Sequence, residues 1–320
     1  MSGFVSGFAH KIEAMLDFRT ARGYKRNTYL HSLEKFDVFC SGNFPGATEL
    51  TREIVHAWVD SETISRGGLT GAASIIRQFG KYLNAVDEEA YILPDKFAPC
   101  KTVFAPYLLS DDELSSLFSE IDSLPQNNNE PFLHDIAPVL FRLIYTCGLR
   151  PNEGRALLVE NVNLNNGEIL ITNTKKNKER IVVMSDNMLA LCQQYTLRRN
   201  IFASGSPFLF PACDGDAISG AKIHAVLNRA WSAATCTPQN PVPRKIRVYD
   251  LRHRFASACL NRWLDEGQDL MVMLPYLRAY MGHNNFSETA YYIHILPENL
   301  TKSPSIDWSM FNAMLPEVTQ

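Results

Sequence analysis

The sequence has few of the features that mark membrane or secreted proteins. It contains no run of about 18 uncharged apolar residues, because its most apolar stretch, residues 136–149, includes Arg142 and is too short to cross a bilayer. The first residues lack a basic flank followed by an apolar block and a cleavage site. The seven cysteines are odd in number and form no CxxC pair. We therefore expect a soluble, cytoplasmic protein with reduced thiols, and neither a zinc finger nor a disulfide framework.

An excess of one charge is also lacking, because 31 Lys and Arg stand against 34 Asp and Glu for a formal charge of −3. This balance excludes a polybasic protein that binds nucleic acid through its total charge, so any charged surface is local. The P-loop, the H-E-x-x-H motif and the G-x-S-x-G motif are absent from the sequence. With 46% hydrophobic residues among 320, the chain has enough apolar material for one large or two medium folded domains.

Apolar residues at helical spacing dominate the first hundred positions. They predict helices over residues 4–22, 27–40, 52–63 and 71–86, and so a bundle of about four helices. Residues 91–110 then contain three prolines, which disfavour a helix and favour an extended connection. We place a domain boundary there, with a helical N-terminal domain at residues 1–105 and a second domain at residues 106–320.

The second domain has a mixed but mainly helical pattern. Ser110 and Glu113 form a capping box for a helix that ends near residue 122, and Gly148 is suited to end a helix over residues 131–147. Two β-branched runs, residues 169–172 and 180–183, flank a polar basic turn and predict a hairpin. Further helices are expected over residues 186–199, 221–234, 250–264, 270–281 and 287–295. The predicted fold class is mainly α with a small antiparallel β-sheet (α+β).

Basic residues concentrate in two segments of this domain, residues 174–180 and 244–254. Runs of this kind are usually solvated turns or exposed helix faces. Arg150 and Arg252, however, stand among apolar residues, and an unpaired buried charge is very costly. We therefore expect these two arginines to bind an anion.

Four motifs follow one another in this domain: GLRPNE at 148–153, TKKNKERIV at 174–182, YDLRHRFAS at 249–257 and MGHNNFSETAYYIH at 281–294. In this order they resemble the tyrosine recombinases, the family of the phage integrases and of the bacterial chromosome-dimer recombinases. The family shares an arginine in a G-L-R-x-x-E turn, a hairpin lysine, an H-x-x-R helix, a G-H pair and a tyrosine nine residues beyond that histidine. The resemblance covers most of the second domain and implies that it is the catalytic domain, with a C-terminal tail.

The resemblance implies a role for each matching residue. The catalytic set would be the arginine pair, the hairpin lysine, the second histidine and the nucleophile: Arg150, Arg252, Lys175, His283 and Tyr292. Tyr249 stands where the family usually has the histidine of H-x-x-R, so the general-base role at that position is open. Glu153 matches the acid after the first arginine and would orient Arg150 rather than contact DNA.

Several neighbours of these residues have alternative interpretations. Lys176 competes with Lys175 as the catalytic lysine, because the hairpin register is uncertain by one residue. Lys178 and Arg180 are expected to contact the DNA backbone or to be solvated. Tyr291 lies beside Tyr292, but only Tyr292 has the spacing of nine residues from the histidine.

His253 directly follows Arg252 and, on a helix, points about 100° away from it. A structural or phosphate-contacting role is therefore expected for this histidine rather than a catalytic one.

The chemistry of strand cleavage calls for these residue types. Phosphoryl transfer needs positive charge over the non-bridging oxygens, and two guanidinium groups supply bidentate donors that stay protonated. A tyrosine hydroxyl, with a reference pKa of about 10, becomes a nucleophile when adjacent cations favour the phenolate. A lysine on a hairpin turn can protonate the leaving 5′-oxygen. The scheme requires no metal ion and no other cofactor, and it requires no ATP because a phosphotyrosine conserves the energy of the phosphodiester.

These inferences predict a site-specific DNA recombinase that acts through a 3′-phosphotyrosine. Its partners would be a double-stranded core site, a homotetramer on two such sites, and accessory DNA-bending or directionality proteins, with a nucleoid-associated location and no membrane. In the N-terminal domain a basic cluster at a helix start would grip DNA: Arg22, Lys25 and Arg26. The alternatives are an inactive DNA-binding regulator with the same fold and a type IB topoisomerase. The apolar residues after position 305 would pack on their own domain or on a neighbouring subunit.

Overall fold

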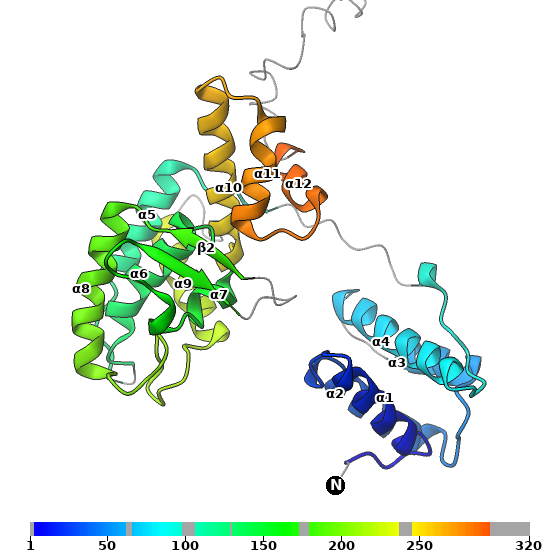
Figure 1. Cartoon of the computed structure of the whole chain (residues 1–320). Helices are drawn as coiled ribbons and strands as arrows, with labels where there is room; N and C mark the ends of the chain where they lie inside the picture. The colour runs from blue at the N-terminus through cyan, green and yellow to red at the C-terminus, as the bar shows by residue number, and fades with distance from the viewer. Residues whose placement is uncertain are drawn as a thin grey trace, which may run out of the picture. The chain divides into compact units, whose positions relative to one another are not determined.

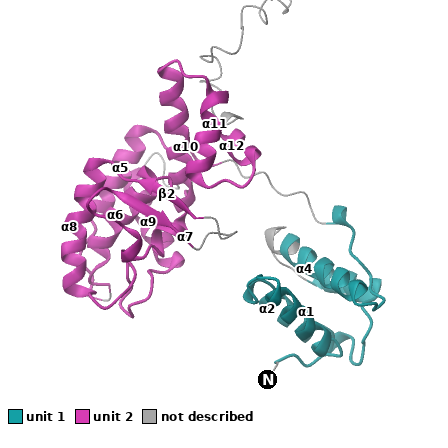
Figure 2. Cartoon of the chain, in the orientation of Figure 1, with its two compact units in different colours: residues 1–104 teal, residues 105–320 magenta. Residues whose placement is uncertain are grey.

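The computed structural model describes residues 3–61, 66–97, 106–128, 130–172, 179–236 and 245–294. The chain divides into two compact units, Met1–Phe104 and Ala105–Gln320 (Figure 2). This division lies one residue from the boundary expected from the prolines. Among the described residues, no helix is long and apolar enough to cross a membrane.

The first unit is a bundle of helices, as its apolar spacing predicts. The helices are α1 (Ala9–Ala21), α2 (Asn27–Asn43), α3 (Arg52–Ser61) and α4 (Arg66–Ala85), followed by the short 3-10 helix η1 (Asp95–Phe97). Four aromatic side chains meet in the core: Phe8, Phe36, Trp58 and Phe79. The first helix starts later than predicted because the buried carboxylate of Asp37 accepts hydrogen bonds from the backbone of Val5 and Ser6. These bonds hold the preceding residues outside the helix.

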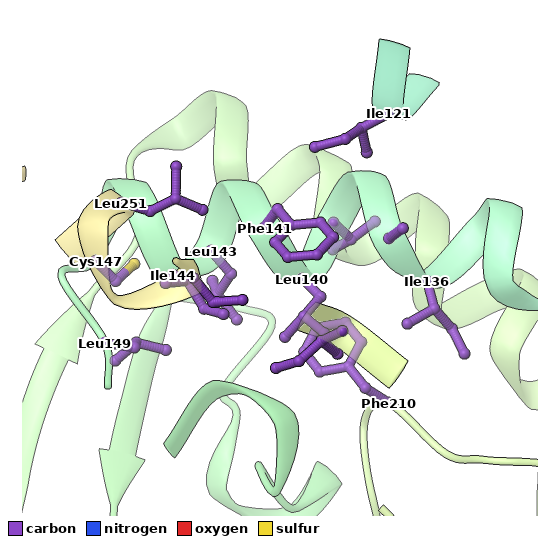
Figure 3. Close-up of a cluster of buried hydrophobic side chains, with 14 of the residues drawn as sticks. Ile121, Ile136, Leu140, Phe141, Leu143, Ile144, Cys147, Leu149, Phe210 and Leu251 are labelled. Carbon is purple, nitrogen blue, oxygen red and sulfur yellow. The ribbon is translucent and has the colours of Figure 1, made fainter. Parts of the chain in front are cut away.

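The second unit packs helices around a central helix, α6 (Leu133–Thr146). Its neighbours are α5 (Asp111–Asp122), α8 (Asp186–Phe202) and α10 (Val248–Asp265), while α9 (Gly220–Thr235) packs on α5 (Figure 1). The apolar residues of α6 point into a cluster completed by side chains from other elements, including Ile121, Phe210 and Leu251 (Figure 3). The capping box predicted at Ser110 and Glu113 is confirmed, with both of its hydrogen bonds formed.

A short hairpin lies against this core. Strands β1 (Glu168–Ile171) and β2 (Arg180–Val183) pair antiparallel, with Ile169 opposite Val182, and both of these side chains are buried. The predicted hairpin and the mainly helical fold class with a small antiparallel sheet are confirmed. Residues 173–178, with Lys175, Lys176 and Lys178, lie outside the described residues, as does the segment after residue 294.

Helix α10 connects the main core to a second apolar cluster. Leu251 near its start belongs to the main core, whereas Ala256, Leu260 and Leu264 pack with α11 (Leu270–Met281) and with Tyr292 of α12 (Phe286–His294). Figure 1 shows α10, α11 and α12 side by side. The short helix α7 (Pro151–Arg155) and the 3-10 helix η2 (Val159–Asn161) connect α6 to the hairpin. Arg252 therefore lies where the two clusters meet.

Gly148 ends the region of α6 in the left-handed conformation predicted from the sequence, with φ +59°. A Cβ atom at this position would lie 2.4 Å from Cδ1 of Phe255, whose ring is stacked on Tyr280. Two constraints therefore require glycine here: the positive φ and the lack of space beside a packed aromatic ring.

We expect Gly148→Ala to lower the free energy of unfolding by about 3 kcal/mol, the sum of left-handed strain and overpacking. The matched control is Gly267→Ala, because Gly267 has φ +71° but no atom within 4 Å of the added Cβ. The control should lose only about 1 kcal/mol. Urea unfolding of the full chain measures both values, and equal losses would contradict the packing constraint.

Candidate active site

Residues from distant parts of the second unit converge where α6 and α11 end. Arg150 is the N-cap of α7, Arg252 lies in the first half of α10, His283 follows the glycine that ends α11, and Tyr292 lies on α12. The left-handed Gly282, with φ +64°, turns the chain from α11 toward His283. The fold therefore brings four of the predicted catalytic residues together.

Arg252 is completely buried, and backbone carbonyl groups satisfy its charge. Its two terminal nitrogens donate hydrogen bonds to the carbonyl oxygens of Gly148 and Met281, each at 2.6 Å. Burial lowers the pKa of Arg252, and the charge of Arg150 lowers it further, against the opposing effect of Tyr249. Its Nε has no hydrogen-bond partner among the described residues. A buried cation with a spare donor is suited to bind an anion.

Glu153 links two of the cations. Its Oε1 accepts a hydrogen bond from Arg150 at 2.8 Å, and its two oxygens accept bonds from Arg180 at 3.0 and 2.7 Å. Burial by itself would raise the pKa of Glu153, but the arginines overcome this effect and hold it at about 2. Glu153 thus contacts Arg150 directly, and its role in orienting this arginine stays a prediction. Arg150 also donates to the carbonyl oxygen of Gly282 at 2.7 Å, which ties α7 to the end of α11.

Of the two roles expected for Arg180, solvation is wrong, and contact with the DNA backbone stays a prediction. Its side chain is 9% exposed and forms an ion pair with Glu153. Besides its bonds to Glu153, its Nε donates to the carbonyl oxygen of Tyr280 at 2.8 Å. The strand pattern explains this result, because Arg180 is the first residue of β2 and pairs with Ile171 over the core. Arg180 is therefore a buried link between the hairpin, α7 and α11.

Tyr292 is enclosed by other residues of the site and is 2% exposed. Its hydroxyl oxygen lies 3.0 Å from Nδ1 of His253, and its ring is stacked on that of His283, with centroids 6.0 Å apart. Burial raises the pKa of Tyr292, although Arg252 and Arg150 act in the opposite direction. Tyr291 packs against the ring of Tyr292 and is half-buried.

His283 is held by a second residue of its own segment. Its Nδ1 lies 2.8 Å from Oγ1 of Thr289, which is fully buried on α12. Burial lowers the pKa of His283 to about 3, and the charges of Arg252 and Arg150 contribute. The ring is therefore neutral at pH 7, with Nε2 as its remaining polar atom.

Tyr249 occupies the position at which the motif usually has histidine. It lies near both arginines: its hydroxyl acts to raise the pKa of Arg150, and its ring centroid is 6.0 Å from Cζ of Arg252. The ring also contacts that of His253, with centroids 5.0 Å apart. Tyr249 therefore belongs to the site, with a phenol in place of an imidazole.

The role predicted for His253 stays a prediction, but the structure adds a contact with Tyr292 that the sequence analysis did not anticipate. The predicted direction of the His253 side chain relative to Arg252 was correct. The neighbour on the same face of the helix, however, is Tyr249, four residues earlier and one helical turn away. Residues at this spacing share a face of the helix, so His253 lies beside the position of the missing motif histidine. The four-residue spacing was visible in the sequence, whereas the contact with Tyr292 depends on how α12 packs.

In the basic cluster of the first unit, two of the three residues are exposed and the third is ion-paired. Arg22 and Lys25 are exposed, and Tyr24 between them is also exposed. Arg26 instead forms ion pairs with Glu13 and Asp17 of α1. We conclude that Arg26 is a link between α1 and α2, which makes it a weaker candidate for DNA contact than expected.

Comparisons with known proteins find similar sequences and a similar fold over most of this chain. The model of the phage integrase family matches residues 108–299. Tyrosine recombinase XerD of Rhizobium meliloti is 27% identical over 301 residues, which cover 90% of this chain and 92% of that protein. XerD of Pseudomonas aeruginosa is 26% identical over 283 residues, which cover 84% and 86%. The crystal structure of the XerH site-specific recombinase, in a post-cleavage complex with a palindromic difH substrate, has the same fold. Its TM-score is 0.64 at 21% identity, over 89% of this chain and 80% of that chain.

We expect Glu153→Gln to lower the free energy of unfolding at pH 7 by about 3 kcal/mol, because it leaves buried cations without their carboxylate. Since the pKa of Glu153 falls from 4.5 to about 2 on folding, the ionised group contributes stability above pH 4.5 that is lost as the pH falls toward 2. The difference between wild type and variant should therefore shrink in acid.

Urea unfolding at pH 7 and pH 3 measures this difference. Glu168→Gln, at an exposed position of β1, is the matched control and should have little effect at either pH. A gap between wild type and Glu153→Gln that stays constant from pH 7 to pH 3 would contradict the role of the carboxylate charge.

Proposed function

Because the chain belongs to the phage integrase family of site-specific tyrosine recombinases, which break and rejoin DNA, we propose that Tyr292 is the nucleophile that cleaves one strand of a duplex core site. The observation that carries this proposal is the convergence of Tyr292, Arg150 and Arg252 from separate segments onto one site. The product is a 3′-phosphotyrosine and a free 5′-hydroxyl.

The arginines stabilise the transferring phosphate. Arg150 is half-buried and oriented by Glu153, so its guanidinium can approach one non-bridging oxygen, while the spare Nε–H of Arg252 suits another. His283, neutral and held by Thr289, has Nε2 available as a third donor or acceptor at the phosphate. Such groups stabilise negative charge that develops in the transition state, and they are oriented before the substrate binds.

Lys175, or its neighbour Lys176, donates a proton to the departing 5′-oxygen from the hairpin turn. A second 5′-hydroxyl can then attack the phosphotyrosine and rejoin the strand. Because one phosphoester bond is exchanged for another, cleavage and rejoining require no ATP. The arginines supply the positive charge at the phosphate, so the proposed scheme uses no metal ion.

The enclosed position of Tyr292 requires a rearrangement before attack. With 2% exposure, its hydroxyl oxygen cannot reach a DNA phosphorus while α12 packs on α10 and α11 as it does here. We infer that binding of the duplex shifts α12 only far enough to expose the phenol to the phosphate next to the arginine pair, and that the Tyr292 hydroxyl stays within reach of His253.

The first unit is assigned to grip the core DNA. Its exposed Arg22, Lys25 and Tyr24 offer two cations and an aromatic ring to phosphates and sugars. A homotetramer on two sites, strand exchange through a four-way junction and accessory DNA-bending proteins complete the proposed reaction. The related XerH structure, a complex with the difH substrate, supports DNA as the partner.

A covalent selection tests the nucleophile. A pool of nicked duplexes with randomised core arms is incubated with protein in EDTA. After cleavage, the short fragment that carries the new 5′-hydroxyl diffuses away at the nick, which leaves the 3′-phosphotyrosine adduct trapped. Wild-type protein should enrich one inverted-repeat sequence as a covalent adduct. Tyr292→Phe should bind the selected duplex but form no adduct, because it lacks the attacking oxygen. Tyr291→Phe is the matched control and should form the adduct at the wild-type level.

Each other outcome rejects part of the proposal. An adduct in Tyr292→Phe identifies a different nucleophile, and an adduct formed only with Mg²⁺ overturns the metal-free scheme. Trapping on many unrelated sequences indicates a topoisomerase, whereas no adduct on any sequence indicates a DNA-binding regulator.

A second prediction concerns Arg150. We expect Arg150→Lys to reduce the single-turnover rate of adduct formation by roughly 10² to 10³ fold, because a lysine keeps the charge but loses the oriented pair of donors. Binding to the selected duplex should weaken only a few fold, because the lysine still contacts the phosphate with a positive charge. Arg155→Lys, on the same short helix and bonded to Asn152 and Ile218, is the control. Equal losses in binding and cleavage would assign Arg150 to DNA positioning alone.

A further inference from the structure

The proton of the Tyr292 hydroxyl needs an acceptor when the oxygen attacks. The usual position for a histidine in the H-x-x-R motif holds Tyr249, and a neutral phenol is far too weak a base to take a proton from another phenol. His283 directs its Nδ1 to Thr289 and lies beside the Tyr292 ring in a stacked arrangement. His283 also has Nε2 available, but among the described residues it is His253, and not Tyr249 or His283, that forms a hydrogen bond with the Tyr292 hydroxyl.

His253 has the required geometry. Its Nδ1 lies 3.0 Å from the hydroxyl oxygen of Tyr292, within hydrogen-bond distance, and its ring contacts those of both Tyr249 and Tyr292. Since His253 lies one turn after Tyr249 on α10, an imidazole here occupies the same helix face as the motif position. The tautomer with the proton on Nε2 leaves Nδ1 free to accept the hydrogen bond from Tyr292.

We propose that His253 is a catalytic residue that accepts the Tyr292 proton through Nδ1 and so takes over the role left open by Tyr249. This inference rests on the proposed function of Tyr292 as the nucleophile. In the cleavage step the bond between the tyrosine oxygen and phosphorus forms, and the bond between phosphorus and the 5′-oxygen breaks. The tyrosine proton moves to His253, and the leaving oxygen takes a proton from the hairpin lysine. In rejoining, the imidazolium of His253 returns its proton to the departing tyrosine oxygen.

The charges around His253 fit this role. Burial lowers the pKa of His253 to about 4, and Arg247 and Arg252 on its own helix lower it further. The ring is therefore neutral and ready to accept a proton before DNA binds. The other titratable groups that face it are the two phenols, Tyr249 and Tyr292, and the neutral His283. A bound phosphate adds negative charge between the arginines, which raises the proton affinity of His253 at the stage when it is needed.

The substitution that separates proton transfer from shape is His253→Asn, because the amide oxygen can accept the hydrogen bond near the place of Nδ1 but takes no proton at neutral pH. We expect its single-turnover cleavage rate on the selected nicked duplex at pH 7 to fall by roughly 10² to 10⁴ fold. Binding of the duplex should be unchanged within a few fold. His224→Asn, the same change at an exposed position of α9, is the matched control and should retain the wild-type rate.

Two further measurements distinguish a proton acceptor from a structural residue. The rate of His253→Asn should rise about tenfold per pH unit between pH 7 and 9, because Tyr292 must then ionise without help, whereas wild type should rise less steeply. A duplex with sulfur in place of the 5′-bridging oxygen has a leaving group that needs no proton. It should restore the rate of Lys175→Ala, or of Lys176→Ala if that residue is the acid, but leave the defect of His253→Asn in place.

Any of three results would overturn the assignment: a wild-type rate in His253→Asn, a defect that does not depend on pH, or recovery on the sulfur-containing duplex, which would move His253 to the leaving-group side. These results differ from the results that would reject the proposed function, which are obtained with wild-type protein and with Tyr292→Phe. If wild-type protein forms no adduct, or if Tyr292→Phe does, the nucleophile is wrong and His253 loses its role with it.

Discussion

The arrangement of the second unit depends on burying guanidinium groups that find their acceptors at the ends of helices. Arg252 bonds to the carbonyl oxygen of Gly148 beyond α6 and to that of Met281 at the end of α11, while Arg150 and Arg180 bond to other carbonyl oxygens of residues 280–282. The last carbonyl groups of a helix have no partner within it and carry partial negative charge. The arginines satisfy these carbonyls, and the carbonyls compensate the cost of burying the charges.

This network also determines where an anion can bind. One carboxylate, Glu153, offsets part of the positive charge of three nearby arginines, since Arg252 is 3.9 Å from it and the other two are hydrogen-bonded to it. A net positive charge remains beside Tyr292 and His283, which lie between the ends of α10, α11 and α12. A phosphate can supply the missing negative charge. The arginines that stabilise the fold then also stabilise this phosphate during its transfer.

The sequence motifs identified the charged and nucleophilic residues, but they said little about how these residues contact one another. Arg180 was expected to contact a phosphate or to be solvated, because it belongs to a basic run near a turn. Its place at the start of β2 instead puts its side chain on the face of the hairpin that packs on the core. The sequence analysis considered only the angle between His253 and Arg252, whereas the contact of His253 with the Tyr292 hydroxyl follows from the packing of α12. Both sets of contacts were missed because a one-dimensional pattern gives the direction of a side chain relative to its own element only.

The sequence by itself determined the helical bundle, the hairpin, the caps at Ser110 and Gly148, and the order of the motifs, because these follow from local periodicity, turn chemistry and spacing. It also determined the family, since four spaced motifs are a specific signal. Only the tertiary structure decided which arginines bond to Glu153 and to helix carbonyl groups, and which of their N–H donors remains available to an anion. It also decided which base faces the Tyr292 hydroxyl. These contacts join residues that are from 27 to more than 100 positions apart, and packing of one element against another fixes them rather than any local preference.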